Sequence, residues 1–247
     1  MNLVIDIGNT YTKIAVFKQD DLVFIKQYEA VDTGVIVELL DEFIISTSII
    51  STVKKNGKEK WEELLDRNTC LLYFNAGMDK GINNRYLTPE TLGTDRLAAV
   101  IGANYLYPGK DNLIISGGTA ITYDRVDAEG NYFGGSISPG LNMRYKALNN
   151  YTAGLPLVTA DDSFHANYGN DTTSAIVSGV QNGIKYELTG FIESYKTGEN
   201  ELNIVLSGGD SIFFDTLLKN SIFAPCIKIE PYLVLKGLNA AIHNNND

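Results

Sequence analysis

Alternating apolar and polar positions open the chain and predict short strands joined by polar turns. Three such segments follow one another closely, and each is rich in Val, Ile and Phe. Segments with helical spacing come next, and in the second of them Trp61, Leu64 and Leu65 share one face. The predicted strands are 2–7, 11–18, 22–29 and 43–50. The predicted helices are 33–42 and 57–67.

The second half of the chain repeats this order of elements. Three strand patterns come first, then a long segment in which Ile176, Val180, Ile184, Leu188 and Phe191 recur at helical spacing. The predicted strands are 112–116, 120–127, 131–137 and 203–209. The predicted helices are 172–196 and 232–243.

A short internal repeat supports this parallel between the halves. LVIDIGNTYT at 3–12 matches LIISGGTAIT at 113–122 with an offset of 110, so that Leu3 meets Leu113, Gly8 meets Gly118 and Thr12 meets Thr122. Repetition at about half the chain length indicates two similar domains that arose by duplication. We expect an N-terminal domain over 1–110 and a C-terminal domain over 111–247.

Charge and composition exclude several classes of function. The net charge is −10, with 20 basic and 30 acidic residues, whereas a protein that binds nucleic acid needs Lys and Arg to neutralise phosphates. No segment is apolar and long enough to span a bilayer, and we expect no signal peptide, no membrane partner and no nucleic-acid partner. Two cysteines and two histidines at unrelated positions do not make a zinc site, and this cysteine usage fits a cytoplasmic protein.

Three glycine-containing turns are candidate phosphate sites. They are Gly8-Asn9-Thr10, the segment GGTA ending in Gly118, Thr119 and Ala120, and the pair Gly208 and Gly209 after a strand. Glycine lets backbone N–H groups approach an anion, and Thr and Asn side chains add donors. Each turn alone is equally compatible with an ordinary hairpin. Together, in duplicated halves, they predict a nucleotide held in a cleft between two domains.

Asp6 ends the first strand, beside the first of these turns. A carboxylate at such a position can hold the Mg²⁺ of bound ATP, directly or through water. We therefore expect Asp6 to face the polyphosphate.

Thr94, Asp95 and Arg96 precede an apolar helical segment. Helix capping by Asp or Thr explains the acid without any chemistry. It does not explain the arginine, because positive charge is unfavourable at a helix start. A bound carboxylate held by Arg96 explains it better, and Asp95 is then a candidate general base.

The motifs resemble those of type III pantothenate kinase, in order and over nearly the entire chain. They are DIGNTYTK, RYLTPETLGTDR, GGTAITYD, GGSISPGL, GNDTTSAIVSG and LSGGD. The resemblance implies an α/β fold of the actin, Hsp70 and sugar-kinase superfold, with two duplicated ribonuclease-H-like domains and a nucleotide cleft between them. It also implies phosphorylation of pantothenate by ATP with Mg²⁺, the first step of coenzyme A biosynthesis, in a homodimer that uses K⁺ or NH₄⁺.

Carried over by position, the resemblance assigns roles to individual residues. Asp95 is the base, and Tyr86, Gly93, Thr94, Asp95 and Arg96 bind pantothenate. Thr172 reaches the partner subunit's pantothenate. The ATP and phosphate residues are Asp6, Gly8, Asn9, Thr10, Lys13, Gly118, Thr119, Ala120, Gly208 and Gly209.

Ser116 departs from the family pattern. The second phosphate motif of the family begins with Asp, which is associated with the monovalent-cation site, and here that position is neutral. We expect weaker binding of K⁺ or NH₄⁺.

Two other functions fit the same fold. One is a regulatory or accessory protein with weak or no kinase activity, although retention of Asp6, Asp95 and Arg96 favours catalysis. The other is a kinase acting on a sugar or acetate, against which the segment from Tyr86 to Arg96 favours pantothenate.

Overall fold

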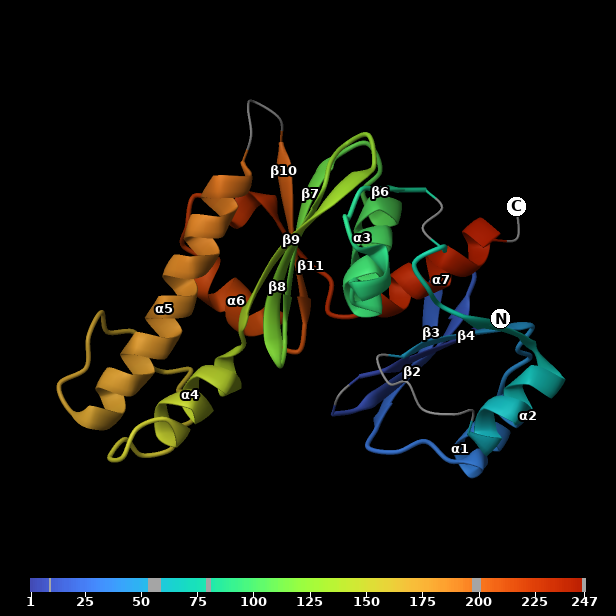
Figure 1. The fold of residues 1–247 in the computed structure, drawn as a ribbon, viewed down its shortest axis with the longest axis horizontal. Helices are drawn as coiled ribbons and strands as arrows, with labels where there is room; N and C mark the ends of the chain where they lie inside the picture. Colours follow the sequence, from blue (N-terminus) through green and yellow to red (C-terminus); the bar gives the residue numbers. More distant parts are fainter. Residues whose placement is uncertain (9, 53–58, 79–80, 197–200, 246–247) are drawn as a thin grey trace. The chain divides into compact units, whose positions relative to one another are not determined.

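The structure is a computed structural model that describes residues 1–8, 10–52, 59–78, 81–196 and 201–245. By packing, the chain divides into two compact units (Figure 1). Unit 1 comprises residues 1–108, 130–132 and 233–247, and unit 2 comprises 109–129 and 133–232. The assignment of ribonuclease-H-like domains to 1–110 and 111–247 stays a prediction. Among the described residues no helix is both long and apolar enough to cross a bilayer.

Unit 1 is built on a five-stranded sheet of order β3-β2-β1-β4-β5. Strand β1 is antiparallel to β2 and parallel to β4, which is itself parallel to β5. The strands are β1 Asn2–Ile7, β2 Thr12–Lys18, β3 Asp21–Tyr28, β4 Thr47–Thr52 and β5 Cys70–Tyr73. The helices of this unit are α1 Thr33–Glu42, α2 Lys60–Asn68, α3 Thr94–Leu106 and α7 Leu233–Asn245, with a 3₁₀ turn at Pro89–Thr91.

The two faces of this sheet carry different side chains because neighbours along a strand alternate. Leu3 and Ile5 pack in a core cluster with Ile36 of α1 and Trp61 of α2. The other face meets α3 and α7: the Asn2 amide donates to Asn239 of α7 at 2.9 Å. Asp6 shares that face with Asn2, so the fold turns its carboxylate toward α3 and α7.

Unit 2 contains most of a six-stranded sheet of order β11-β10-β7-β8-β9-β6. The strands of this sheet are β7 Asp111–Gly117, β8 Ala120–Val126, β9 Asn131–Pro139, β10 Leu202–Gly208, β11 Ile227–Ile229 and β6 Asn83–Asn84. Strand β6 pairs with residues 131–132 of β9, and both of these segments belong to unit 1. The helices of unit 2 are α4 Leu141–Asn150, α5 Thr172–Tyr195 and α6 Ser211–Leu218, with a 3₁₀ turn at Ala224–Cys226. Residues of α5 and α6 cover one sheet face, where Leu113, Ile184 and Phe214 belong to one buried cluster.

The two sheets share one topology, which supports the predicted duplication. Strands β9-β8-β7-β10-β11 follow the same order as β3-β2-β1-β4-β5, and the central strand is parallel to its later neighbour in both. The offset of 110 holds for the first strand, since Asp6 pairs with Ser51 on β4 as Ser116 pairs with Ser207 on β10.

The offset fails on the return strand. Ser116 lies opposite Thr122, whereas Asp6 lies opposite Lys13. The predicted equivalence of Thr12 and Thr122 is therefore wrong by one position, because the second turn is one residue shorter.

Candidate active site

Asp6 lies at the carboxyl end of β1, where three strands of unit 1 meet. It is in register with Lys13 on β2 and with Ser51 on β4. The hydroxyl of Ser51 also donates to the hydroxyl of Thr94 at 3.2 Å, which connects this strand end to the start of α3. The structure thus brings together Asp6 and the Thr94–Arg96 segment, which the sequence analysis had identified as candidates from two separate motifs.

The pKa of Asp6 is raised to about 6. Burial is the main cause, and the negative charge of Asp95 adds to it. Lys13 and a hydrogen bond from Ser51 act in the opposite direction and only partly compensate. A carboxylate in this situation favours a cation beside it, which fits the predicted Mg²⁺ of ATP.

The start of α3 is not capped by a side chain. Gly93 occupies the N-cap position, and no side chain makes a cap hydrogen bond there. Asp95 is exposed in the first turn, and its Oδ1 accepts from the Arg96 N–H at 2.9 Å. Its carboxylate is therefore accessible, as a general base requires.

Arg96 is held against aromatic rings. Its side chain is buried, with the whole residue only 7% exposed, and its guanidinium carbon lies 5.6 Å from the ring centroid of Tyr86. Tyr86 stacks on Tyr132 with centroids 6.3 Å apart and planes 7° apart. This stack orients the guanidinium, and it supplies a packing reason for the arginine besides the predicted anion.

The first glycine turn uses one of its own donors. The Gly8 N–H donates to the Tyr11 carbonyl at 3.1 Å, so it closes the turn. Thr10 is exposed and Lys13 is half-buried on the return strand. Asn9, also predicted to bind phosphate, lies outside the described residues.

The second turn has the same internal closure. The Gly118 N–H donates to the Ala120 carbonyl at 3.1 Å, and the side chain of Thr119 is exposed. Before this turn, the hydroxyls of Ser116 and Ser207 are both buried and have no hydrogen-bond partner within the described part of the chain. These two residues are in register across β7 and β10.

Gly208 ends β10 and lies against the second turn, and Gly209 follows it. Gly208 has a φ of +79°, and a Cβ there would stand 2.2 Å from the carbonyl oxygen of Gly117. Only glycine fits both the left-handed backbone and this close approach. The Asp210 N–H also donates to that carbonyl at 3.3 Å, so two of the predicted phosphate turns form one assembly in unit 2.

Thr172 is the first residue of α5 and is exposed. Asp171 caps the helix through the N–H groups of Thr173 and Ser174, at 2.9 and 3.1 Å. The Thr172 side chain is therefore exposed and is not needed for the cap, and its role in the partner subunit's pantothenate site stays a prediction.

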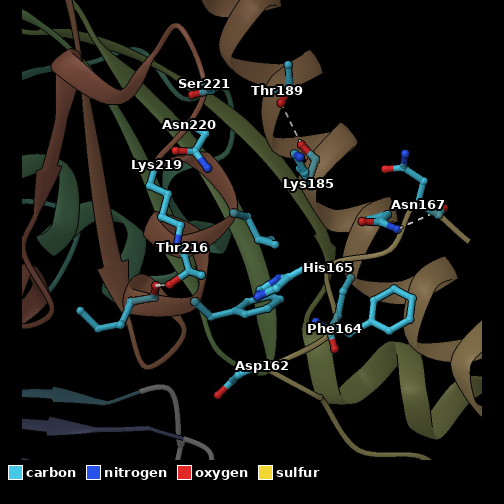
Figure 2. Close-up of a pocket in the computed structure, with 15 residues that line it drawn as sticks. Asp162, Phe164, His165, Asn167, Lys185, Thr189, Thr216, Lys219, Asn220 and Ser221 are labelled. Carbon is cyan, nitrogen blue, oxygen red and sulfur yellow. Dashed lines mark hydrogen bonds between the residues drawn. The ribbon is translucent and has the colours of Figure 1, made fainter.

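A cavity of about 630 Å³ opens in unit 2 beside α6 (Figure 2). Thr216 of α6 lines it, as does Lys219, the residue after that helix. Lys185 of α5 and His165 of the loop before α5 also line it. Helix α6 begins directly after the Gly208–Gly209 turn. The sequence interpretation gave these cavity residues no role.

Metal ligation rests on few carboxylates. No group of three or more His, Cys, Asp or Glu residues that could hold a metal occurs among the residues the structure describes. Asp6, with Asp95 as its charged neighbour, fits a divalent ion that is held mainly by the phosphates of a nucleotide. Ser116 and Ser207 offer neutral hydroxyl oxygens, which can coordinate a monovalent cation but add no negative charge to hold it.

Ser51 is the main site residue that the sequence did not reveal. It is the second-last residue of β4, and only the parallel pairing of β1 with β4 places it beside Asp6. The polar run Ser51-Thr52 after a buried strand was the available signal.

Comparison with known proteins identifies the family. A family model described as type III pantothenate kinase matches residues 2–194. The chain belongs to the type III pantothenate kinase family. Curated type III pantothenate kinases agree over the full length: the Bacteroides fragilis protein is 42% identical over 246 residues, covering 100% of this chain and 99% of the relative. The Christiangramia forsetii protein is 42% identical over 247 residues and covers 99% of each chain.

Solved structures confirm the fold of this family member. A Campylobacter jejuni protein described as a Baf family transcriptional activator has a TM-score of 0.59 at 21% identity and covers 99% of this chain and 98% of its own. The activator of 2-hydroxyisocaproyl-CoA dehydratase from Clostridium difficile, solved with bound ADPNP, has a TM-score of 0.56 at 11% identity, with coverage of 99% and 96%. The predicted family and the predicted two-domain α/β superfold are therefore confirmed, and membership in a kinase family implies ATP with a divalent metal.

Proposed function

We propose that this protein transfers the γ-phosphoryl group of ATP to the primary hydroxyl of pantothenate, giving 4′-phosphopantothenate and ADP. This is the first step of coenzyme A biosynthesis, and we expect it to occur in the cytoplasm. The observation that carries the proposal is the convergence of Asp6 and Asp95, in a member of this family, through the Ser51–Thr94 hydrogen bond.

Asp95 is the proposed general base. Its exposed carboxylate accepts the hydroxyl proton while the hydroxyl oxygen bonds to the γ-phosphorus. The bond from that phosphorus to the bridging oxygen breaks, and its electron pair leaves on ADP. Asp6 is the proposed carboxylate that would face a divalent ion bound with ATP, and such an ion would neutralise phosphate charge.

Arg96 is proposed to bind the pantothenate carboxylate. Its burial and the Tyr86–Tyr132 stack fix the guanidinium plane, which favours a bidentate contact. Gly93 and Thr94 form the backbone beside it, where α3 begins.

Thr10 of unit 1 and Thr119 of unit 2 are each proposed to donate a hydroxyl hydrogen bond to phosphate. Because Gly8 and Gly118 use their N–H groups inside the turns, these glycines act by shaping the turns. Lys13 adds positive charge in unit 1, and Ala120 starts the return strand in unit 2.

The nucleoside is proposed to follow Gly208 and Gly209 into the cavity beside α6. That cavity is open to solvent and is large enough for a base and ribose. It lies in unit 2, where the Gly208–Gly209 turn contacts the 117–120 turn. A monovalent cation, if used, would bind weakly because Ser116 is neutral.

A homodimer is the proposed assembly. Strand β9 pairs with β6 only through residues 131–132, and it exposes Phe133 by 71% and Ile137 by 65%. Tyr186 on α5 is 62% exposed. Exposed apolar residues on a sheet edge and on a neighbouring helix favour a second copy as partner.

The experiment for the dimer combines size and complementation. Sedimentation velocity should give a dimer for the wild type and a smaller species for Phe133→Asp with Ile137→Asp. Mixing Asp95→Asn subunits with Thr172→Val subunits should restore one normal site in each heterodimer. A fully active monomer would contradict the shared site.

The experiment for the activity is coupled detection of ADP with pantothenate as acceptor. Asp95→Asn should lower turnover by about 10²–10⁴ while ATP still binds. Asp41→Asn on the exposed end of α1 is the matched control and should retain activity. Near-normal turnover of Asp95→Asn at saturating substrates would reduce Asp95 to a structural residue.

A further inference from the structure

A carboxylate on α5 joins three elements that surround the second phosphate turn. One oxygen of Glu187 accepts from the Tyr123 hydroxyl at 2.8 Å and from the Ser138 hydroxyl at 2.5 Å. Its other oxygen forms an ion pair with Arg144 of α4. Tyr123 lies on β8, which is the return strand of that turn, so Glu187 contacts both the turn's own strand and the segment that follows.

Arg144 connects Glu187 to the backbone at the end of β9. Its Nε donates to the Pro139 carbonyl at 2.8 Å, and its Nη2 donates to Ser138 at 3.3 Å. These bonds fix the peptide immediately before Gly140. The guanidinium can hold this geometry because the Glu187 carboxylate balances its charge in a half-buried site.

Gly140 in turn touches the phosphate turn itself. Its N–H donates to the Thr119 carbonyl at 3.2 Å, and a Cβ on Gly140 would stand 2.2 Å from the Gly118 carbonyl oxygen. With no room for even one methyl group, a shift of Gly140 must move residues 118–119. A continuous chain of contacts therefore runs from Glu187 through Arg144 and Gly140 to Thr119.

We propose that Glu187 and Arg144 are positioning residues for ATP, which set the place of the 117–120 turn without touching the nucleotide. This inference rests on the proposed role of that turn in binding phosphate. Burial acts to raise the pKa of Glu187, but the hydrogen bonds from Ser138, Arg144 and Tyr123 outweigh it and lower the pKa. Glu187 is therefore a permanent anion at neutral pH and keeps Arg144 in place.

The test measures nucleotide affinity directly. Titration calorimetry of the full-length protein with Mg-ADPNP, without pantothenate, gives the Kd for wild type, Glu187→Gln and Arg144→Lys. Each variant should weaken the Kd about tenfold, as expected for loss of one charge-assisted hydrogen bond. KM for pantothenate should stay within about twofold, since Tyr86, Asp95 and Arg96 lie on unit 1 and Thr172 lies 15 residues before Glu187 on α5.

A matched ion pair at the other end of β7 serves as the control. Asp111 accepts from Arg125 at 2.8 Å and is 6% exposed. Asp111→Asn should reduce stability at least as much as Glu187→Gln, but it should leave the Mg-ADPNP Kd unchanged. A purely structural role for Glu187 predicts that both variants behave alike, and that result would overturn the proposal.

Two further arms keep the test decisive. The double variant should bind no more weakly than either single variant if the pair acts as one unit. If Glu187→Gln does not fold, Ser138→Ala should weaken the Kd about threefold, and an unchanged Kd there would overturn the proposal. Absence of pantothenate phosphorylation in the wild type would refute the proposed function alone, because the Kd comparison needs no acceptor.

Discussion

Replacing Asp6 with asparagine is expected to stabilise unit 1 at alkaline pH while it removes activity. The pKa of Asp6 is about 6 in the folded protein and 3.8 in the reference state of an unfolded chain. Between these values the folded state binds more protons than the unfolded state, so stability falls as pH rises from 3.8 to about 6. Each pKa unit corresponds to about 1.36 kcal/mol, so above pH 7 the raised pKa of Asp6 lowers the free energy of unfolding by about 3 kcal/mol. This value is an upper limit, since the carboxylate is partly solvated.

The assay follows urea unfolding at pH 5 and pH 8 through Trp61. This residue is the sole tryptophan of the chain and is buried in the core of unit 1. At pH 5 the raised pKa of Asp6 lowers the free energy of unfolding by about 1.6 kcal/mol. The increase in the free energy of unfolding caused by Asp6→Asn should therefore be about 1.4 kcal/mol larger at pH 8 than at pH 5. Asparagine is close in size and can still accept from Ser51, which limits other effects.

Two further variants isolate the cause. Asp95→Asn removes a charge that raises the pKa of Asp6, so the pH dependence of its stability should be smaller than that of the wild type. Asp41→Asn, on the exposed end of α1, should show no difference between the two pH values. An equal change in stability for Asp6→Asn at pH 5 and pH 8, or a loss at pH 8, would refute the reasoning.

Two predictions concern the substrate and the cation. Arg96→Ala should raise KM for pantothenate about 10- to 100-fold with little change in KM for ATP, while the exposed Arg85→Ala serves as control; a selective loss of ATP affinity would show that Arg96 is misassigned. Ser116→Asp should lower the concentration of K⁺ needed for half-maximal activity, because a carboxylate adds charge where a buried hydroxyl now has no partner in the described structure. Equal K⁺ dependence in both proteins would place Ser116 outside any cation site.

Long elements with clear periodicity were predictable from the sequence alone. Strand β1 and helix α1 have the predicted bounds, because their apolar residues alternate or recur on one face and polar turns flank them. The predicted strand 43–50 was wrong at its start, since β4 begins at Thr47, and Phe43 ends α1 through its N–H bond to Leu39. Phe43 is therefore the C-cap residue of α1, although its apolar side chain had suggested that it belonged to the strand.

Several short elements were not predicted. Helix α4 follows Pro139 and Gly140, which indicate a loop, and its sequence LNMRYKALNN has too few apolar residues for a clear stripe. Helix α6 has 8 residues, and β5 and β11 have 4 and 3, too few for periodicity to identify them. Their formation depends on tertiary packing against the longer strands.

The site could be predicted only where its residues carry a local signal. Arg96 is anomalous for a helix start, which also drew attention to its neighbour Asp95, and Asp6 is anomalous after a buried strand. Ser51 has no such anomaly, because its role depends on the register of β1 with β4 across 45 residues of sequence. Glu187 has none either, since its partners lie on β8, β9 and α4.

The duplicated topology explains why one strand end is charged and the other is neutral. Asp6 and Ser116 occupy the same position in their sheets, at the end of the central strand beside its parallel neighbour. A carboxylate there lowers stability by up to about 3 kcal/mol at neutral pH, as the pKa of Asp6 shows. Lys13 lies opposite Asp6 and offsets part of this, whereas Thr122 lies opposite Ser116 and offers no charge. Serine at 116 therefore avoids a second unbalanced carboxylate, which unit 2 could hold only with a bound cation.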